Sequence, residues 1–325
     1  MPEYKIDAVI SWVDGNDPVL NAKRASYSDA RSVRHEDEAA PTRFANLGEI
    51  FWCIASINRF APFINRIYVV TDGQDPCLDS FLQEYFPNGY IPVEIVDHKV
   101  IFKGYEEYLP VFNSRSIESM VWRIPGLNEH FVLFNDDFII TRPLSVSDFF
   151  TDDGKVLCYG DKFSTLWGKV LTGLKPRQDG RCVATFKSSL LKAVEIAGGS
   201  PFFYYLRHTP RPLLRSFYES FFPEHEDILT ANLNHRFRDA SQFNAQELQY
   251  LFLTKEGRCN GVNTRDIAFY LEPKSKPHYC LKKMRKLRSG HYRFCCFNSL
   301  DSAGEQDRQM VFGWVSELLG IRTGA

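Results

Sequence analysis

The sequence predicts an α/β fold with a Rossmann-like, mostly parallel sheet and helices on both of its faces. Over the first 140 residues, short β-rich segments alternate with segments of helical periodicity, an order typical of parallel sheets. The β-rich segments also end in acidic or amide residues, at Asp14, Asp72, Asp97 and the Asn-Asp-Asp step at 135–137. Parallel strands bring their carboxyl ends to one edge, where such sheets bind ligands. We therefore expect these groups to face one cleft.

Each predicted element of this region rests on its own pattern. The helix expected over 43–60 follows from Phe44, Leu47, Phe51 and Ile54, which recur at intervals of three and four residues. β-Branched and aromatic residues, followed by turn-forming residues, predict the strands. The expected strands are 7–13, 66–71, 91–97 and 130–140, and the other expected helices are 77–86 and 114–124.

The second half of the chain is expected to be mainly helical. Strand-like runs at 156–161 and 181–186 precede helical patterns at 188–198, 211–222 and 241–257. No clear linker separates the halves, so we expect 1–150 to form an α/β core and 151–325 to complete the same catalytic unit.

Composition excludes several classes of protein. The net charge of -1 argues against a nucleic-acid-binding protein. The first residues lack a secretory signal, and no apolar run reaches the roughly 20 residues that span a bilayer. We therefore expect a cytoplasmic protein. Its eight scattered cysteines, which include no CxxC pair, are expected to be free thiols.

Asp136 and Asp137 follow a predicted buried strand. Adjacent carboxylates repel each other unless a cation or a hydrogen-bond donor lies between them. A divalent metal bound to a nucleotide diphosphate would supply that cation, because Mg²⁺ takes one or two carboxylates together with phosphate oxygens. A solvated turn is the alternative.

Two turn sequences resemble each other, Asp-Gly-Asn-Asp-Pro at 14–18 and Asp-Gly-Gln-Asp-Pro at 72–76. Asp14, Asp17 and Asp72 could bind ribose hydroxyls or the amides of a base, or they could simply form turns. Neither loop matches a dinucleotide-binding or P-loop pattern.

Several basic residues could meet an anionic ligand. His208 lies in a proline-containing segment between Arg207 and Arg211, and Arg236 and Arg238 carry guanidinium groups that match phosphate geometry. Surface solvation is the alternative for each arginine. The segment 274–293 has eight Lys or Arg and no acid, and it is a solvated face or a site for an anionic polymer or the inner leaflet of a membrane.

Together these segments resemble the Stealth family of sugar-1-phosphate transferases, which has four signature regions. The first resembles residues 6–18, the second 42–140, the third 208–243 and the fourth 293–301. In the fourth, the family's usual Asn-Asp is Asn298-Ser299 here, with Asp301 nearby, so the role of the second residue is lost or moved to Asp301.

The resemblance implies a GT-A-like nucleotide-sugar-binding core and transfer of a hexose-1-phosphate from a UDP-sugar, UDP-GlcNAc or another UDP-HexNAc, to a saccharide hydroxyl, with release of UMP. It implies Mg²⁺ or Mn²⁺ as cofactor. Carried over residue by residue, the implied metal ligands are Asp136 and Asp137. The implied donor-binding residues are Trp12, Val13, Asp14, Gly15, Asp17, Arg43, Asn46, Glu49, Thr71, Asp72, Gly73, Gln74, Asn135 and Asn298.

The hypothesis for the chemistry makes His208 the general base, because an unperturbed imidazole titrates near neutrality. Asp137 is the alternative base, and Arg236 or Arg238 holds the phosphate. A metal-dependent glycosyltransferase that releases UDP, and a catalytically silent carbohydrate-binding assembly subunit, remain the rival readings. The compartment implied is the cytoplasm, with 274–293 as a possible peripheral contact to capsule-assembly machinery at the membrane.

Overall fold

The protein is described by a computed structural model, which covers residues 5–27, 46–173, 185–274, 276 and 278–323. Its largest sheet has five strands in the order β3-β2-β1-β4-β8. β1 to β4 run parallel, and β8 pairs antiparallel with β4. The strands are β1 Ile6–Ser11, β2 Ile64–Thr71, β3 Val93–Asp97, β4 His130–Asn135 and β8 Arg211–Leu214.

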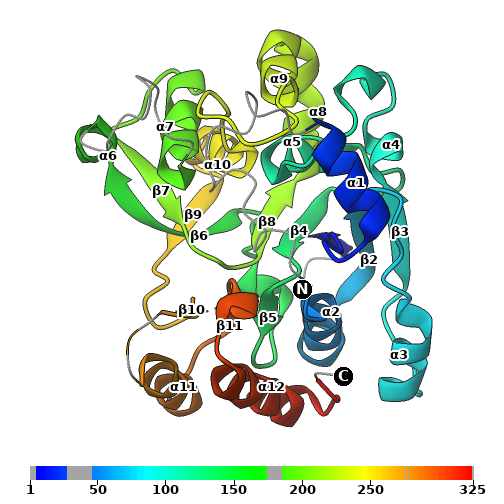
Figure 1. Cartoon of the computed structure of the whole chain (residues 1–325). Coiled ribbons are helices and arrows are strands. Elements are labelled where there is room, and N and C mark those ends of the chain that lie inside the picture. Colours follow the sequence, from blue (N-terminus) through cyan, green and yellow to red (C-terminus); the bar gives the residue numbers. More distant parts are fainter. Residues whose placement is uncertain (1–4, 28–45, 174–184, 275, 277, 324–325) are drawn as a thin grey trace.

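Helices cover both faces of this sheet (Figure 1). α2 and α3 lie on one side, and α4, α5 and α8 lie on the other. α1 lies beside the carboxyl ends of the parallel strands. The bounds are α1 Pro18–Tyr27, α2 Glu49–Phe60, α3 Leu78–Tyr85, α4 His98–Ile101, α5 Ser114–Glu118 and α8 Arg215–Glu224.

Two three-stranded sheets complete the structure, in the orders β10-β11-β5 and β7-β6-β9. Their strands are β5 Phe138–Ile140, β6 Val156–Ser164, β7 Phe202–Leu206, β9 Cys259–Val262, β10 Ala268–Leu271 and β11 Phe294–Phe297. The remaining helices are α6 Thr165–Gly173, α7 Phe186–Ile196, α9 Glu226–Leu233, α10 Ala245–Lys255, α11 Tyr279–Ser289 and α12 Glu305–Leu319. Helices predominate in the second half, as predicted, and the strand predicted over 156–161 is confirmed as the first part of β6. The other strands of these two sheets in the second half were not predicted.

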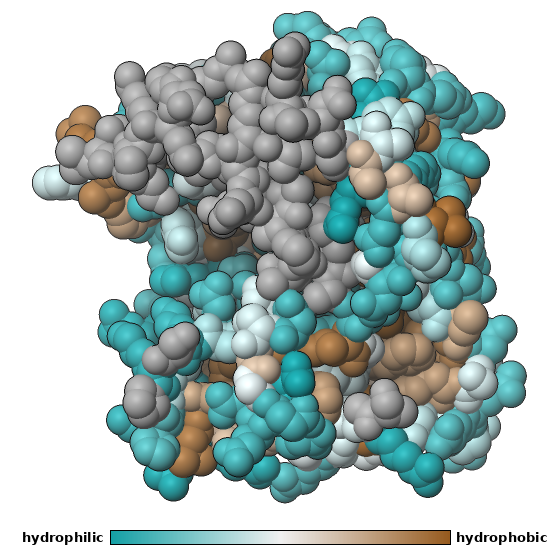
Figure 2. Space-filling view, in the orientation of Figure 1, coloured by the Kyte–Doolittle hydropathy of each residue, from teal (hydrophilic) through white to brown (hydrophobic). Residues whose placement is uncertain are grey.

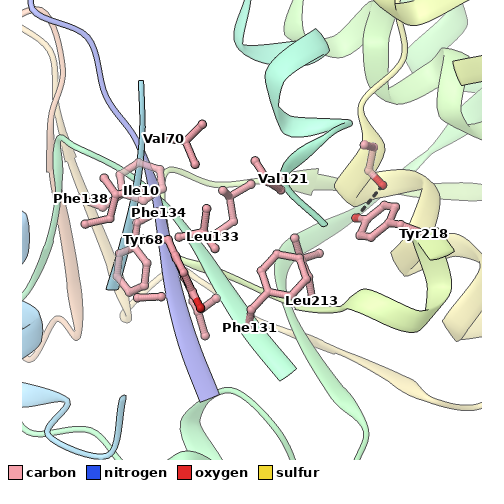
Figure 3. Close-up of a cluster of buried hydrophobic side chains, with 14 of the residues drawn as sticks. Ile10, Tyr68, Val70, Val121, Phe131, Leu133, Phe134, Phe138, Leu213 and Tyr218 are labelled. Atoms are coloured by element: carbon pink, nitrogen blue, oxygen red, sulfur yellow. Dashed lines mark hydrogen bonds between the residues drawn. The ribbon is translucent and has the colours of Figure 1, made fainter. Parts of the chain in front are cut away.

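The main core lies around the central strands of the five-stranded sheet. Figure 3 shows Ile10 of β1, Tyr68 of β2 and Phe134 of β4 among its side chains, all of them fully or almost fully buried. Burial of one such large side chain contributes about 1.5–3 kcal/mol. The strands are apolar on both faces because helices cover both faces. This packing fixes the register that brings the strand ends together.

The parallel sheet confirms the sequence prediction for its four strands and for the α2 and α3 helices, with small differences at their ends. Residues 43–45 of the predicted first helix lie outside the described residues. The predicted strand 130–140 is in fact two strands in different sheets, because the chain turns at Asp136-Asp137. That turn places both carboxylates at the sheet edge.

Three other predictions need correction. The helix predicted over 114–124 is a short α-helix followed by a 3₁₀ turn at Val121–Arg123. Thr185 is the N-cap of α7, so the end of the predicted strand 181–186 is a helix start, while 181–184 lie outside the described residues. The helix predicted over 211–222 begins only at 215, because the preceding four residues form β8.

β8 is held at the sheet edge by side chains. Pro212, which has no N–H, is tolerated there because an edge strand has one unpaired side. The Gln249 amide accepts a hydrogen bond from the Leu214 N–H at 3.0 Å and donates one to the Leu214 carbonyl at 2.7 Å. Gln249 thus replaces the missing neighbouring strand.

The outer surface is mostly hydrophilic in the view of Figure 2. At α6, however, Leu166 and Trp167 are 71% and 63% exposed. No helix in the described part of the chain is long and apolar enough to cross a membrane. The seven cysteines in that part are free thiols, and Cys182 lies outside it.

Candidate active site

A cavity of about 330 Å³ lies at the carboxyl edge of the five-stranded sheet. It brings together residues from the ends of β1, β2 and β4, the start of α2, the segment before α5, and the segments around 208, 238 and 298. The predicted site residues that line it are Trp12, Val13, Glu49, Asp72, Asn135, Asp136, Asp137, His208, Arg238 and Asn298. The expectation that the strand-end acids share one cleft is therefore confirmed for Asp72 and for the 135–137 step.

Three carboxyl groups at the cavity have raised pKa values. Burial, with Asp137 and Glu49 nearby, holds the pKa of Asp136 well above its usual range. Burial raises the pKa of Asp137 to about 6, although the Cys296 thiol and Arg211 oppose the rise. Burial raises the pKa of Glu49 to about 7, with smaller contributions from Asp137 and Asp301. The carboxyl groups are held close together in a poorly solvated place, where a bound cation would be strongly favoured.

The Asp136-Asp137 pair suits a divalent cation. Asp137 Oδ2 accepts a hydrogen bond from the Cys296 thiol at 3.1 Å, while its buried Oδ1 has no hydrogen-bond partner among the described residues. Within those same residues, no group of three or more His, Cys, Asp or Glu is arranged to hold a metal ion. Mg²⁺ commonly takes one or two carboxylates and fills its remaining positions with water and phosphate oxygens. The pair therefore fits a cation that arrives with a phosphate group.

His208 borders the cavity beside two aromatic rings, and the residue is exposed to solvent. Its imidazole stacks on Tyr270 with ring centroids 4.5 Å apart, and Phe138 meets it edge-on at 6.4 Å. Desolvation by these surroundings, with the charges of Arg211 and Arg207, lowers its pKa to about 4. This pKa is lower than the near-neutral value expected from the sequence. The ring is neutral at pH 7 and can accept a proton, but it is a weaker base than expected.

Asn298 connects the fourth signature segment to His208. Its side-chain N–H donates to the Tyr270 hydroxyl at 2.9 Å, and the Tyr270 ring is the one that stacks on His208. Asn298, Ser299 and Asp301 all line the cavity. Asp301 therefore lies in the same cavity as Ser299, the position at which the family usually has an aspartate, and could take its place.

The two predicted arginines have different surroundings. Arg238 lines the cavity, and its guanidinium donates to the Ser114 hydroxyl at 2.9 Å. Arg236 is not among the lining residues. Its guanidinium donates to the carbonyls of Glu107 and Leu109, both at 3.3 Å, and lies over the Tyr27 ring at 5.0 Å. Arg238 is thus the better placed of the two for a phosphate.

The two similar turns brace each other. The Gln74 amide donates to the Asp14 carbonyl at 3.0 Å and to Asp17 Oδ2 at 2.9 Å, and its oxygen accepts from the Asp14 N–H at 3.0 Å. Asp17 Oδ1 also accepts from the Val19 N–H at 2.8 Å, at the start of α1. These acids form the loop rather than line the cavity, so the predicted donor contacts of both are not supported.

Several other predicted donor-binding residues also do not line the cavity: Gly15, Asn46, Thr71, Gly73 and Gln74. Thr71 is fully buried, and the Asn46 side chain accepts from the Gly48 N–H at 3.0 Å, just before α2. Arg43 lies outside the described residues.

Sequence reasoning missed two contributors, Tyr270 and Lys23, and Lys23 pairs with Asp72 at 2.6 Å. It also gave no role to Cys296 of the fourth signature segment, or to the effect of Arg211 on the pKa of Asp137. Tyr270 and Lys23 reach the site through tertiary contacts that no short motif reveals.

Comparison with known proteins identifies the family. The profile of Stealth protein conserved region 1 matches residues 4–32, and that of conserved region 2 matches residues 43–157. A receptor polysaccharide phosphotransferase of Streptococcus oralis is 30% identical over 332 residues, covering 94% of this chain and 93% of the relative. The chain belongs to the Stealth family.

Other Stealth relatives carry similar names. A capsular polysaccharide phosphotransferase of Streptococcus pneumoniae is 28% identical, with 94% of each chain covered. One of Neisseria meningitidis is 30% identical, covering 87% of this chain and 74% of the relative. Like these Stealth proteins, the chain is a transferase of phosphorus-containing groups.

Among solved structures, a galactosyltransferase in complex with donor and acceptor sugar analogues aligns with 98% of this Stealth protein and 97% of its own chain. The identity is 12% and the TM-score is 0.49. The α/β assignment rests on the sheet order instead.

Proposed function

We propose that this Stealth protein transfers a hexose-1-phosphate from a UDP-sugar, UDP-GlcNAc or another UDP-HexNAc, to a hydroxyl of an oligo- or polysaccharide. The product would be a phosphodiester of a capsular polysaccharide, and UMP would leave. The observation that carries this proposal is the single cavity that unites Asp136, Asp137, His208 and Arg238. Such a set combines carboxylates for a cation, a neutral imidazole and a guanidinium for phosphate.

In this reaction the acceptor oxygen attacks the β-phosphorus of the donor. A new O–P bond forms, the bond from the β-phosphorus to the bridging oxygen breaks, and the bridging oxygen leaves with UMP. The acceptor proton passes to His208, which is neutral at pH 7 because its pKa is about 4. A bound diphosphate would raise that pKa, since nearby negative charge favours the imidazolium.

The remaining residues supply position and charge. Arg238 would hold the transferred phosphate, and Asp136 and Asp137 would hold Mg²⁺ or Mn²⁺, which neutralises charge on the diphosphate. Asp137 is the alternative base if it binds no metal. Positioning and electrostatic stabilisation are expected to supply most of the rate, as in other phosphoryl transfers.

A product assay tests the proposal directly. The protein is incubated with Mg²⁺, an oligosaccharide pool and a panel of UDP-sugars, and UMP is separated from UDP. UMP that forms only with acceptor present is the expected result. UDP would instead establish a glycosyltransferase, and absence of both nucleotides would favour a carbohydrate-binding subunit.

The His208→Ala variant tests the assigned base. Turnover should fall by about 10²–10⁴-fold, the usual contribution of a general base, while UDP-sugar affinity measured by calorimetry stays within about threefold. His291→Ala, at an exposed histidine near Arg142, is the matched control and should keep wild-type turnover. Near-normal turnover of His208→Ala would refute the assignment.

A further inference from the structure

A second cavity, of about 880 Å³, lies beside the proposed active site. It is formed by β6, β7, β9 and β10 and by the segment that joins the last two. Figure 1 shows these strands on the opposite side of the molecule from α3 and β3.

The two cavities meet at one side chain, because His208 lines both of them. Tyr270 lines the second cavity, stacks on His208, and accepts a hydrogen bond from Asn298, which lines the first. A hydroxyl in the second cavity can therefore reach the imidazole that also borders the first cavity. A transfer between two substrates needs such a shared group.

The lining of the second cavity combines aromatic and polar groups. Phe186, Tyr205 and Tyr270 supply partly exposed rings, and the exposed Asn263 supplies a hydrogen-bonding side chain. Ligand cavities commonly join apolar surface with a few polar groups that fix orientation. A sugar presents both an apolar ring face and hydroxyls, so this lining suits a saccharide.

The charge of this lining favours an anion. Lys162, Arg207 and Arg265 line the cavity, against a single acid, Asp161. Arg207 pairs with that acid, its Nε donating to Asp161 Oδ2 at 2.9 Å. The exposed Arg265 guanidinium has no ion pair among the residues that the structure describes. Arg265 is therefore available for a phosphate.

We propose that the second cavity binds the growing end of an anionic acceptor saccharide. The terminal sugar packs against Tyr205 and Tyr270 with a hydroxyl directed to His208, and the phosphodiester behind it meets Arg265. This inference rests on the proposed function and adds the class of acceptor, a saccharide that already carries phosphate. It also makes chain extension more efficient than the first addition to a neutral sugar.

The test compares two labelled probes, a trimer of N-acetylglucosamine units joined by phosphodiesters and a neutral glycosidic trimer of the same sugar. Wild-type protein should bind the phosphodiester trimer more tightly, in thermophoresis without donor, and should use it with a lower KM. Arg265→Ala should raise the Kd and KM for the phosphodiester trimer about tenfold or more, as expected for loss of a charged hydrogen bond. The Kd and KM for the neutral trimer should change less than about twofold. Tyr205→Ala should weaken both probes.

Arg258→Ala is the matched control, because Arg258 is an exposed arginine beside β9 that pairs with Glu256 and does not line the cavity. Equal binding of both probes by wild-type protein, or unchanged phosphodiester binding in Arg265→Ala, would overturn the proposed acceptor site. The binding assay needs no turnover, and UMP release from the panel of acceptors is scored separately. Failure of the acceptor site is thus distinguishable from failure of the proposed function.

Discussion

Replacing Glu49 by glutamine should stabilise the metal-free protein at high pH. Glu49 is only 8% exposed at the start of α2, and its Oε2 accepts a hydrogen bond from the Leu47 N–H at 2.6 Å. The amide oxygen of the introduced glutamine can accept the same bond. What the substitution removes is an ionised carboxylate that the folded state desolvates and places near Asp137 and Asp301.

The size of the effect follows from the pKa of Glu49, which burial raises from 4.5 to about 7. The folded protein binds this proton over a pH range where the unfolded chain has lost it, so stability falls as the pH rises from 4.5 to 7. Each unit of pKa difference corresponds to about 1.4 kcal/mol. Ionisation of Glu49 therefore lowers the free energy of unfolding by about 3 kcal/mol above pH 7 and by almost nothing below pH 4.5.

Urea denaturation in EDTA at pH 5 and pH 8 measures this effect. The free energy of unfolding of Glu49→Gln should exceed that of wild type by about 1 kcal/mol at pH 5 and about 3 kcal/mol at pH 8. Glu84→Gln, at an exposed glutamate of α3, is the control and should show no such pH dependence. A difference between Glu49→Gln and wild type that is the same at both pH values would refute the reasoning.

Two further predictions concern charge elsewhere in the protein. Arg211→Met should raise the pKa of His208, because the Arg211 charge is one of the causes that lower it. The NMR titration of the imidazole should therefore move to higher pH, and Arg211→Lys, which keeps the charge, should move it less. An unchanged titration in Arg211→Met would contradict the effect of Arg211 on His208. Lys282, Arg285 and Lys286 are exposed cations of α11. Neutralising all three should weaken binding to anionic vesicles or anionic polymer at low salt by about 1 kcal/mol per charge, as measured by cosedimentation. Turnover on short acceptors should be kept. Salt-insensitive binding that survives the triple substitution would exclude this helix as the anion-binding face.

Two other cations of the basic segment are already engaged in the fold. Lys283 Nζ donates to the Tyr270 carbonyl at 2.9 Å, and Arg288 pairs with Glu317 at 2.8 Å. The sequence-based proposal treated the segment as one uniform charged surface. The helical part of the segment has two different sides. Cys280, Met284 and Leu287 lie on the buried side of α11, and only the opposite side faces solvent.

The parallel sheet was predictable from the sequence because its signals are local. Each β-rich segment is short, apolar and followed by turn residues, so the strand ends and their acids could be placed without tertiary information. β8 was not predictable in the same way. Arg211–Leu214 continues into a helical pattern, and its strand conformation depends on β4 on one side and on Gln249, some 35 residues later, on the other.

The similar turns at 14–18 and 72–76 show why motif matching alone could not separate ligand contacts from support. Their acids are identical in type and spacing, yet Asp72 lines the cavity while Asp14, the corresponding residue of the first turn, does not and accepts a hydrogen bond from the Asn16 N–H instead. The oxygens of a carboxylate in such a turn can accept hydrogen bonds either from a ligand or from nearby N–H groups of the protein. Which of these partners they meet depends on how the two loops pack against each other. Here Gln74 of the second turn donates hydrogen bonds to the Asp14 carbonyl and to the Asp17 carboxylate, and Trp12 rather than either acid lines the cavity.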